Sequence, residues 1–169
     1  DTEDPHEMLA DAIPVAEMLP LTAATFVPRG GTPLLDALGR LIEHVTMRAD
    51  VLAGLGQPTE EVVIAVVTDG HENSSSRYRL AEVRRLVDLR REAGWTFVFL
   101  GAGIDTYAES QGIGIDPRSV QQFTPDAPGA DVAFSALSAS LTAWRDDVRG
   151  AAPMDRDDFF RGTKRAERR

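Results

Sequence analysis

The chain has 169 residues, which is the usual size of one domain with a core of its own. Apolar residues make up 43% and charged residues 27%, and no apolar run approaches the roughly 18 residues of a membrane-spanning helix. The net charge of −9 argues against nucleic acid as the main partner, and the absence of cysteine excludes disulfides and thiol chemistry. A chain without cysteine fits the cytoplasm, and its start at Asp1 rather than Met leaves room for a lost upstream segment.

The first part of the chain is acidic and interrupted by prolines up to about residue 28. Residues 13–19 are predicted to form one short edge strand, which a proline within them limits. Between residues 33 and 55, apolar residues recur at steps of three and four, which predicts a helix. Pro33 fits the first position of this helix and Thr32 fits its N-cap.

The middle of the chain predicts a strand followed by a charged helix. Residues 62–67 are all apolar and mostly β-branched, which is typical of a strand buried on both faces of a parallel sheet. A helix is predicted over residues 79–93, where six arginines between Arg77 and Arg91 alternate with acidic residues. These arginines predict a solvated, ion-paired face, and a partner-docking face is the alternative. The residues expected to point inward are Leu80, Val83 and Val87.

The last third of the chain predicts two more strands and two helices. Strands are expected at residues 95–100 and 119–123, and a short helix at residues 106–111 lies between them. Residues 131–148 predict a final amphipathic helix. Its apolar face is expected to hold Phe134, Leu137, Leu141, Trp144 and Val148.

This order of elements predicts an α/β fold with a mostly parallel, doubly wound sheet and helices on both faces. We expect this domain to span residues 1–149, followed by a charged, disordered tail over residues 150–169. Ligands of such folds bind at the carboxyl ends of the strands. Asp69 and the loop at residues 101–105 are expected at these ends.

Thr32 and Asp69 are the candidate ligands of a divalent cation. Each offers a hard oxygen of the kind that Mg²⁺ prefers, and each is expected where a loop meets a regular element. The alternative is structural, because Thr32 also fits a helix cap and Asp69 a turn cap. Gly30 and Gly31 before the threonine could also cradle an anion, although the lysine of a phosphate-binding P-loop is missing.

Neighbouring polar residues have two interpretations each. Glu72 and Asn73 support the metal from outside its ligand sphere, or they are solvated loop residues. Asp105 is expected to cap the short helix that follows it, and a role as a metal ligand is the alternative. His71 could act as a general base only with a nucleophile in reach, for which serines 74–76 are the candidates.

Three motifs together resemble the von Willebrand factor type A (vWA) domain. The run Gly-Gly-Thr-Pro-Leu-Leu-Asp-Ala-Leu at residues 30–38 resembles its second ligand loop, in which the threonine hydroxyl contacts the metal. Residues 62–70, which end in Thr-Asp-Gly, resemble its fourth strand and third ligand loop, in which the aspartate binds the metal through water. Residues 97–105 resemble the next strand and its loop. The resemblance covers about residues 22–148.

The first ligand loop of that family, Asp-x-Ser-x-Ser, has no counterpart in this chain. The resemblance therefore implies a vWA domain that lacks its first strand–helix region at the N-terminus. A metal-ion-dependent adhesion site built on Thr32 and Asp69 alone would be incomplete, and Mg²⁺ or Mn²⁺ would bind weakly or not at all. Gly30, Gly31 and Gly70 would belong to the surrounding loops.

The function implied by the resemblance is that of a binding module and not of an enzyme. It would mediate protein–protein interaction through the cation, and the partner could supply a carboxylate to the metal. Neither nucleic acid nor a membrane is expected as a partner. The alternatives are a metal-free scaffold or assembly protein and a hydrolase that uses Asp69 and His71.

Overall fold

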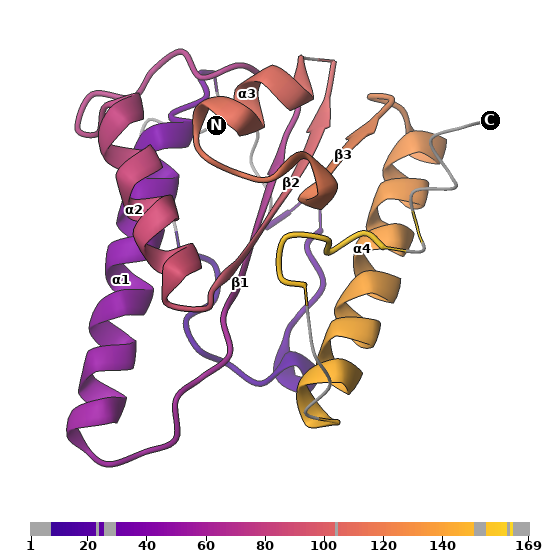
Figure 1. The fold of residues 1–169 in the computed structure, drawn as a ribbon. Helices are drawn as coiled ribbons and strands as arrows, with labels where there is room; N and C mark the ends of the chain where they lie inside the picture. Colours follow the sequence, from indigo (N-terminus) through magenta and orange to yellow (C-terminus); the bar gives the residue numbers. More distant parts are fainter. Residues whose placement is uncertain are drawn as a thin grey trace.

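The computed structural model describes residues 8–22, 24–25, 30–103, 105–150, 155–161 and 163. Its centre is an all-parallel sheet of three strands in the order β1-β2-β3 (Figure 1). The strands are β1 (Val63–Thr68), β2 (Thr96–Ala102) and β3 (Val120–Phe123). The predicted α/β class with a parallel sheet is therefore confirmed.

The helices lie on both faces of this sheet, as expected. In Figure 1, α1 and α2 cover one face, α4 covers the other, and α3 lies at the carboxyl ends of the strands. The four helices are α1 (Leu34–Gly54), α2 (Leu80–Glu92), α3 (Thr106–Gly112) and α4 (Ala127–Arg149). Two short 3-10 helices are η1 (Val15–Glu17) and η2 (Pro117–Ser119).

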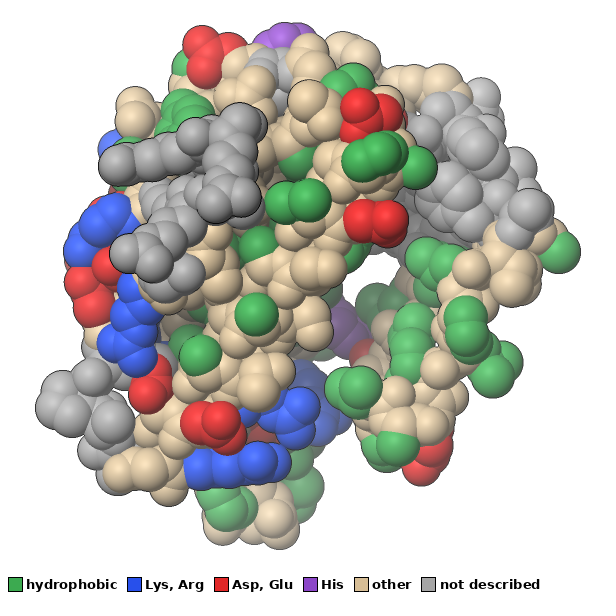
Figure 2. Space-filling model, turned by 90° about the vertical axis from the view of Figure 1, so that its right-hand side faces the viewer, with side chains coloured by type: hydrophobic (Ala, Val, Ile, Leu, Met, Phe, Trp, Pro, Cys, Tyr) green, Lys and Arg blue, Asp and Glu red, His purple; other side chains and the backbone are tan. Residues whose placement is uncertain are grey.

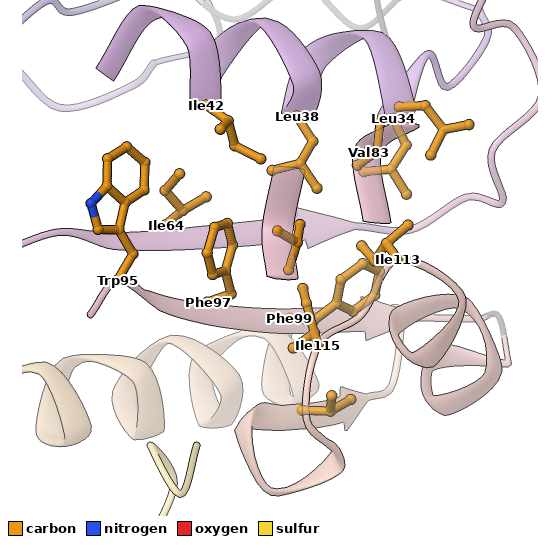
Figure 3. Close-up of a cluster of buried hydrophobic side chains, with 13 residues drawn as sticks. Leu34, Leu38, Ile42, Ile64, Val83, Trp95, Phe97, Phe99, Ile113 and Ile115 are labelled. Atoms are coloured by element: carbon orange, nitrogen blue, oxygen red, sulfur yellow. The ribbon is translucent and has the colours of Figure 1, made fainter. Parts of the chain in front are cut away.

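The larger core cluster lies between β1, β2 and the two helices α1 and α2 (Figure 3). Residues one helical turn apart on α1 and α2 point toward the aromatic side chains of β2, because a spacing of three or four places them on one helix face. The buried contributors from these four elements include Leu38, Ile42, Val83, Val87, Phe97 and Phe99. The predicted inward positions Val83 and Val87 are confirmed, whereas Leu80 is largely exposed and that prediction was wrong.

Strand β1 is less buried than its sequence predicted. Ile64 is the only buried residue of β1, and Val67 is 45% exposed. The reason is its place in the sheet, because β2 is its only partner strand among the described residues. The backbone of Val62 faces β2, because its carbonyl accepts a hydrogen bond from Thr96 N–H. Successive residues of a strand point their N–H and C=O groups to opposite sides, so those of Val63, Ala65 and Val67 face the open edge of the sheet.

A second, smaller core lies between α4 and the other face of the sheet. Ala133 and Ser140 are buried on α4, while Leu137, Leu141 and Trp144 are partly buried. Phe134 is 52% exposed, so its predicted inward position was wrong. Figure 2, which looks onto this side, shows scattered hydrophobic side chains in the centre, more of them close together on the right, and a hollow between these two parts. The helix begins earlier than expected because Asp126 caps it through Gly129 N–H.

The chain after α4 is not the solvated tail that its charge predicted, at least over residues 155–161. Phe159 and Phe160 are buried in the second core, and Phe160 has no exposed surface. Ser119 Oγ donates to the Asp157 carbonyl at 2.9 Å, and the Arg91 guanidinium lies 2.7 Å from the Asp157 carboxylate. Two aromatic side chains therefore anchor a segment that looks polar in sequence. Residues 164–169 lie outside the described part.

Residues 13–19 and the charged face of α2 lie on the surface of the protein. Residues 13–19 contain no strand; they form η1 and extended chain with exposed apolar side chains, so the predicted edge strand was wrong. The charged face of α2 carries the expected ion pairs, with Asp88 within 4 Å of both Arg84 and Arg91. Across the described residues, none of the helices is long and apolar enough to cross a membrane.

Candidate functional site

The loops that carry Thr32 and Asp69 meet at the carboxyl end of β1. Asp69 and Gly70 follow the last residue of that strand, and Thr32 lies two residues before α1. A Cβ atom placed on Gly70 would lie 2.7 Å from Thr32 Oγ1, which is too close for a side chain. The glycine is thus required by the approach of the threonine hydroxyl. The structure brings together two loops that are almost forty residues apart in sequence.

Thr32 is not the N-cap of α1, contrary to the prediction. The cap position is Pro33, and no side chain of that residue or of Thr32 bonds to the first turn. The free N–H groups of that turn are satisfied from a distance. Leu35 N–H donates to Glu72 Oε2 at 2.8 Å, and Asp36 N–H donates to Ser75 Oγ at 3.0 Å. The Thr32 hydroxyl therefore has no capping role to explain its position.

Glu72 and Asn73 join the two loops and are not merely solvated. Asn73 Oδ1 accepts from Thr32 N–H at 2.7 Å, and Asn73 N–H donates to the Thr32 carbonyl at 3.2 Å. The Glu72 carboxylate also accepts from the N–H groups of Ser74 and Ser75 and from Ser75 Oγ. These bonds fix Thr32 against the loop that follows Asp69.

Asp36 is a buried carboxylate that sequence reasoning did not single out. It is 3% exposed, and its oxygens accept from the backbone N–H groups of Ser76, Arg77 and Tyr78 at 2.8 to 3.2 Å. Burial by itself raises the pKa of this carboxyl group, but the three backbone donors outweigh burial and lower the pKa below its usual value. An aspartate in a first helical turn is common, so no local pattern indicates these distant partners.

Asp69 is exposed and available to a ligand. None of the described residues forms a hydrogen bond or ion pair with its carboxylate. The turn around it is fixed by Thr68, whose Oγ1 donates to the Gly70 carbonyl at 2.9 Å and accepts from Gly70 N–H at 3.2 Å. The carboxylate is therefore held on a defined turn and keeps its acceptor sites free.

The loop after β2 contributes a helix cap, and α3, which follows it, contributes a second carboxylate. Asp105 accepts from Ala108 N–H at 3.1 Å, so its predicted role as the cap of α3 is confirmed. Glu109 was missed by the sequence reasoning. Its Oε1 accepts from Glu72 N–H at 3.1 Å, and its Oε2 lies 3.4 Å from His71 Nδ1. No signal in the sequence could have paired residues 37 positions apart.

The contacts around the site bear on the alternative chemistries. Ser75 Oγ donates to Glu72 and His71 contacts Glu109, so no described contact joins a serine hydroxyl to the histidine. Gly31 adopts the left-handed conformation, with φ of +94°, as a Gly-Gly-Thr turn allows. A bound phosphate there would compete with Glu72 and Ser75, which already occupy the N–H groups of α1.

As a metal centre, the site offers two protein oxygens. Among the described residues there is no group of three or more His, Cys, Asp or Glu side chains that could hold a metal ion. Thr32 and Asp69 supply a hydroxyl and a carboxylate, which suit Mg²⁺ or Mn²⁺ in kind but fall short of six ligands in number. Their chemistry fits a weakly held, largely hydrated cation.

Comparison with known proteins gives no match: no family model, no curated protein and no solved structure is similar to this chain at a significant level. The class that fold and site define is an α/β domain with an open parallel sheet and polar loops at its carboxyl end. Membership of the vWA family is a proposal and rests on the three motifs together with the geometry around Thr32.

Proposed function

We propose that this chain is a vWA-like binding module that recognises a protein partner through a divalent cation held at Thr32 and Asp69. The observation that carries the proposal is the approach of Thr32 Oγ1 to Gly70, next to Asp69. The threonine hydroxyl caps no helix and the Asp69 carboxylate has no described partner. Two hard oxygen donors left without a structural task, at the carboxyl end of a parallel sheet, are well suited to a ligand.

The cation would be Mg²⁺ or Mn²⁺, with Thr32 and Asp69 as its protein ligands. It would supply a localised positive charge, which can bind a carboxylate of the partner. Glu72 and Asn73 would keep the threonine loop in place. The fold would be a vWA domain without its first strand–helix region, and the cytoplasm is the proposed location. Two protein ligands predict weak binding of the cation.

The experiment is a Mn²⁺ titration of the isotopically labelled full chain, followed by NMR. Bound Mn²⁺ broadens the signals of nearby amides and so reveals weak sites. We expect selective broadening around Thr32 and Gly70, which Asp69→Ala and Thr32→Ala should abolish. The matched control is Asp50→Ala, which removes an exposed carboxylate of α1. Equal broadening in Asp69→Ala and in the wild type would reject the site.

A metal-free scaffold is the second candidate, and one observation favours it. The two loops are already joined without a cation, by the Asn73–Thr32 hydrogen bonds and by the Glu72 carboxylate. In that case Thr32 and Asp69 would remain only as parts of rigid loops. The same titration separates the two candidates, because a scaffold predicts no selective broadening at any Mn²⁺ concentration below that of nonspecific binding.

A further inference from the structure

Glu109 lies on a helix that is fixed against the end of β2. A Cβ atom on Gly101 would lie 2.5 Å from Thr106 Oγ1, so the first residue of α3 is pressed onto the strand. Thr106 and Ser110 are completely buried, which leaves little freedom for the helix to rotate. Glu109 lies beside this buried stripe, and its side chain is 21% exposed. Its carboxylate is therefore presented from a rigid support.

Both oxygens of Glu109 contact the residues that follow Asp69. Oε1 accepts from Glu72 N–H at 3.1 Å, and Oε2 lies 3.4 Å from His71 Nδ1. The carboxylate thus contacts two consecutive residues, which lie two and three positions after Asp69. This contact ties the loop that follows Asp69 to α3.

Further hydrogen bonds connect Glu72 to the segment that carries Thr32. The backbone of Glu72 is held by Glu109, while its side chain accepts from Leu35 N–H at the start of α1. Glu72 is also followed directly by Asn73, which accepts a hydrogen bond from the Thr32 N–H and donates one to the Thr32 carbonyl. A displacement of Glu72 would consequently move Asp69 and Thr32 relative to each other.

We infer that Glu109 is a positioning residue for the candidate metal site: from α3 it sets the place of the Asp69 loop relative to Thr32. The inference rests on the proposed function for its effect on metal binding. Residues that orient metal ligands without touching the metal typically change metal affinity by about 10- to 100-fold when they are replaced.

The test compares Glu109→Ala with Glu109→Gln in the full chain. Both variants remove the same negative charge, but the glutamine oxygen can still accept from Glu72 N–H. Gln111→Ala is the control, because Gln111 is an exposed residue of the same helix. The readouts are Mn²⁺ affinity from amide broadening near Thr32 and the hydrogen-exchange rate of the Glu72 amide. Thermal unfolding of each variant checks that the fold persists.

We expect Glu109→Ala to weaken Mn²⁺ binding about tenfold and to speed exchange of the Glu72 amide by about the same factor. Glu109→Gln should keep slow exchange and most of the affinity. The inference is overturned if Glu109→Ala behaves like Gln111→Ala, or if Glu109→Gln loses as much affinity as Glu109→Ala, since charge and not position would then matter. If the wild type binds no Mn²⁺, the proposed function fails, and the exchange rate of Glu72 alone decides whether Glu109 positions the loop.

Discussion

The carboxylate of Asp36 on α1 accepts a hydrogen bond from the backbone N–H of Tyr78, 42 residues further along the chain, at 2.8 Å. The tyrosine ring lies on the same helix, so close to Gly39 that a Cβ atom there would be 2.7 Å from the ring. Together with the bonds to Ser76 and Arg77, this places the last part of the loop after Asp69, residues 76–78, on the first turns of α1. The geometry of the candidate site depends on this attachment.

Replacing Asp36 with asparagine should destabilise the protein by about 1–3 kcal/mol. The asparagine retains one oxygen but turns an amide group with hydrogens toward backbone donors, which leaves a buried donor unsatisfied. Urea unfolding measures the loss. Asp50→Asn on the exposed side of the same helix is the control and should change stability by less than about 0.5 kcal/mol. Equal stability of the two variants would contradict the role of Asp36.

The contribution of Asp36 should depend on pH with a definite sign. Its pKa in the folded protein is lower than the usual value, so the folded state favours the ionised form. The stabilisation is complete above the unfolded pKa of about 3.9 and is lost as the pH falls through the lower folded pKa. The stability difference between the wild type and Asp36→Asn should therefore shrink below about pH 4. A difference that stayed constant from pH 7 to pH 2 would contradict this account.

Phe160→Ala should cost about 3–5 kcal/mol, because the phenylalanine is fully buried in the second core. The matched variant is Phe134→Ala on α4, where the side chain is 52% exposed and the loss should be much smaller. Chemical denaturation of both variants gives the comparison. If the segment over residues 155–161 were solvated, Phe160→Ala would destabilise the protein no more than Phe134→Ala does.

Gly70→Ala should disturb the Thr32 loop, because the new Cβ atom would lie 2.7 Å from Thr32 Oγ1. We expect a loss of about 1–3 kcal/mol, which is typical of overpacking. The double variant Gly70→Ala/Thr32→Ala should recover part of it, since the clashing hydroxyl is gone. A double-mutant cycle with no coupling between the two positions would show that the loops do not meet as described.

The sequence predicted the elements of the fold well because the periodicity of apolar residues depends on local spacing. It could not distinguish β1 from β2, since both are apolar runs, and only the number of neighbouring strands makes β2 completely buried. The position of Phe134 was wrong because the smaller residues Ala133 and Ala136 face the sheet. Apolar character alone does not show which residue of a helical turn faces the sheet where α4 packs closely against it.

The candidate site was predictable only in part. Thr32 and Asp69 could be named because each belongs to a local pattern. Thr32 lies between two glycines and the start of a helix, and Asp69 lies between the end of a strand and a glycine. Their supporting carboxylates, Asp36 and Glu109, have partners 37 to 42 residues away, and no spacing rule connects them. The misassigned cap at Thr32 has the same cause, because Glu72 satisfies the helix start from a different loop.

The most direct measurement is the anomalous diffraction of a crystal of the full chain soaked in Mn²⁺. The account predicts one peak beside Thr32 Oγ1, at about 2.0–2.3 Å as expected for a hard divalent cation, with Asp69 bound directly or through one water. The peak should be missing in Asp69→Ala crystals treated in the same way. A wild-type map without a peak between these loops, or a peak that persists in Asp69→Ala, would contradict the proposed metal-dependent binding function.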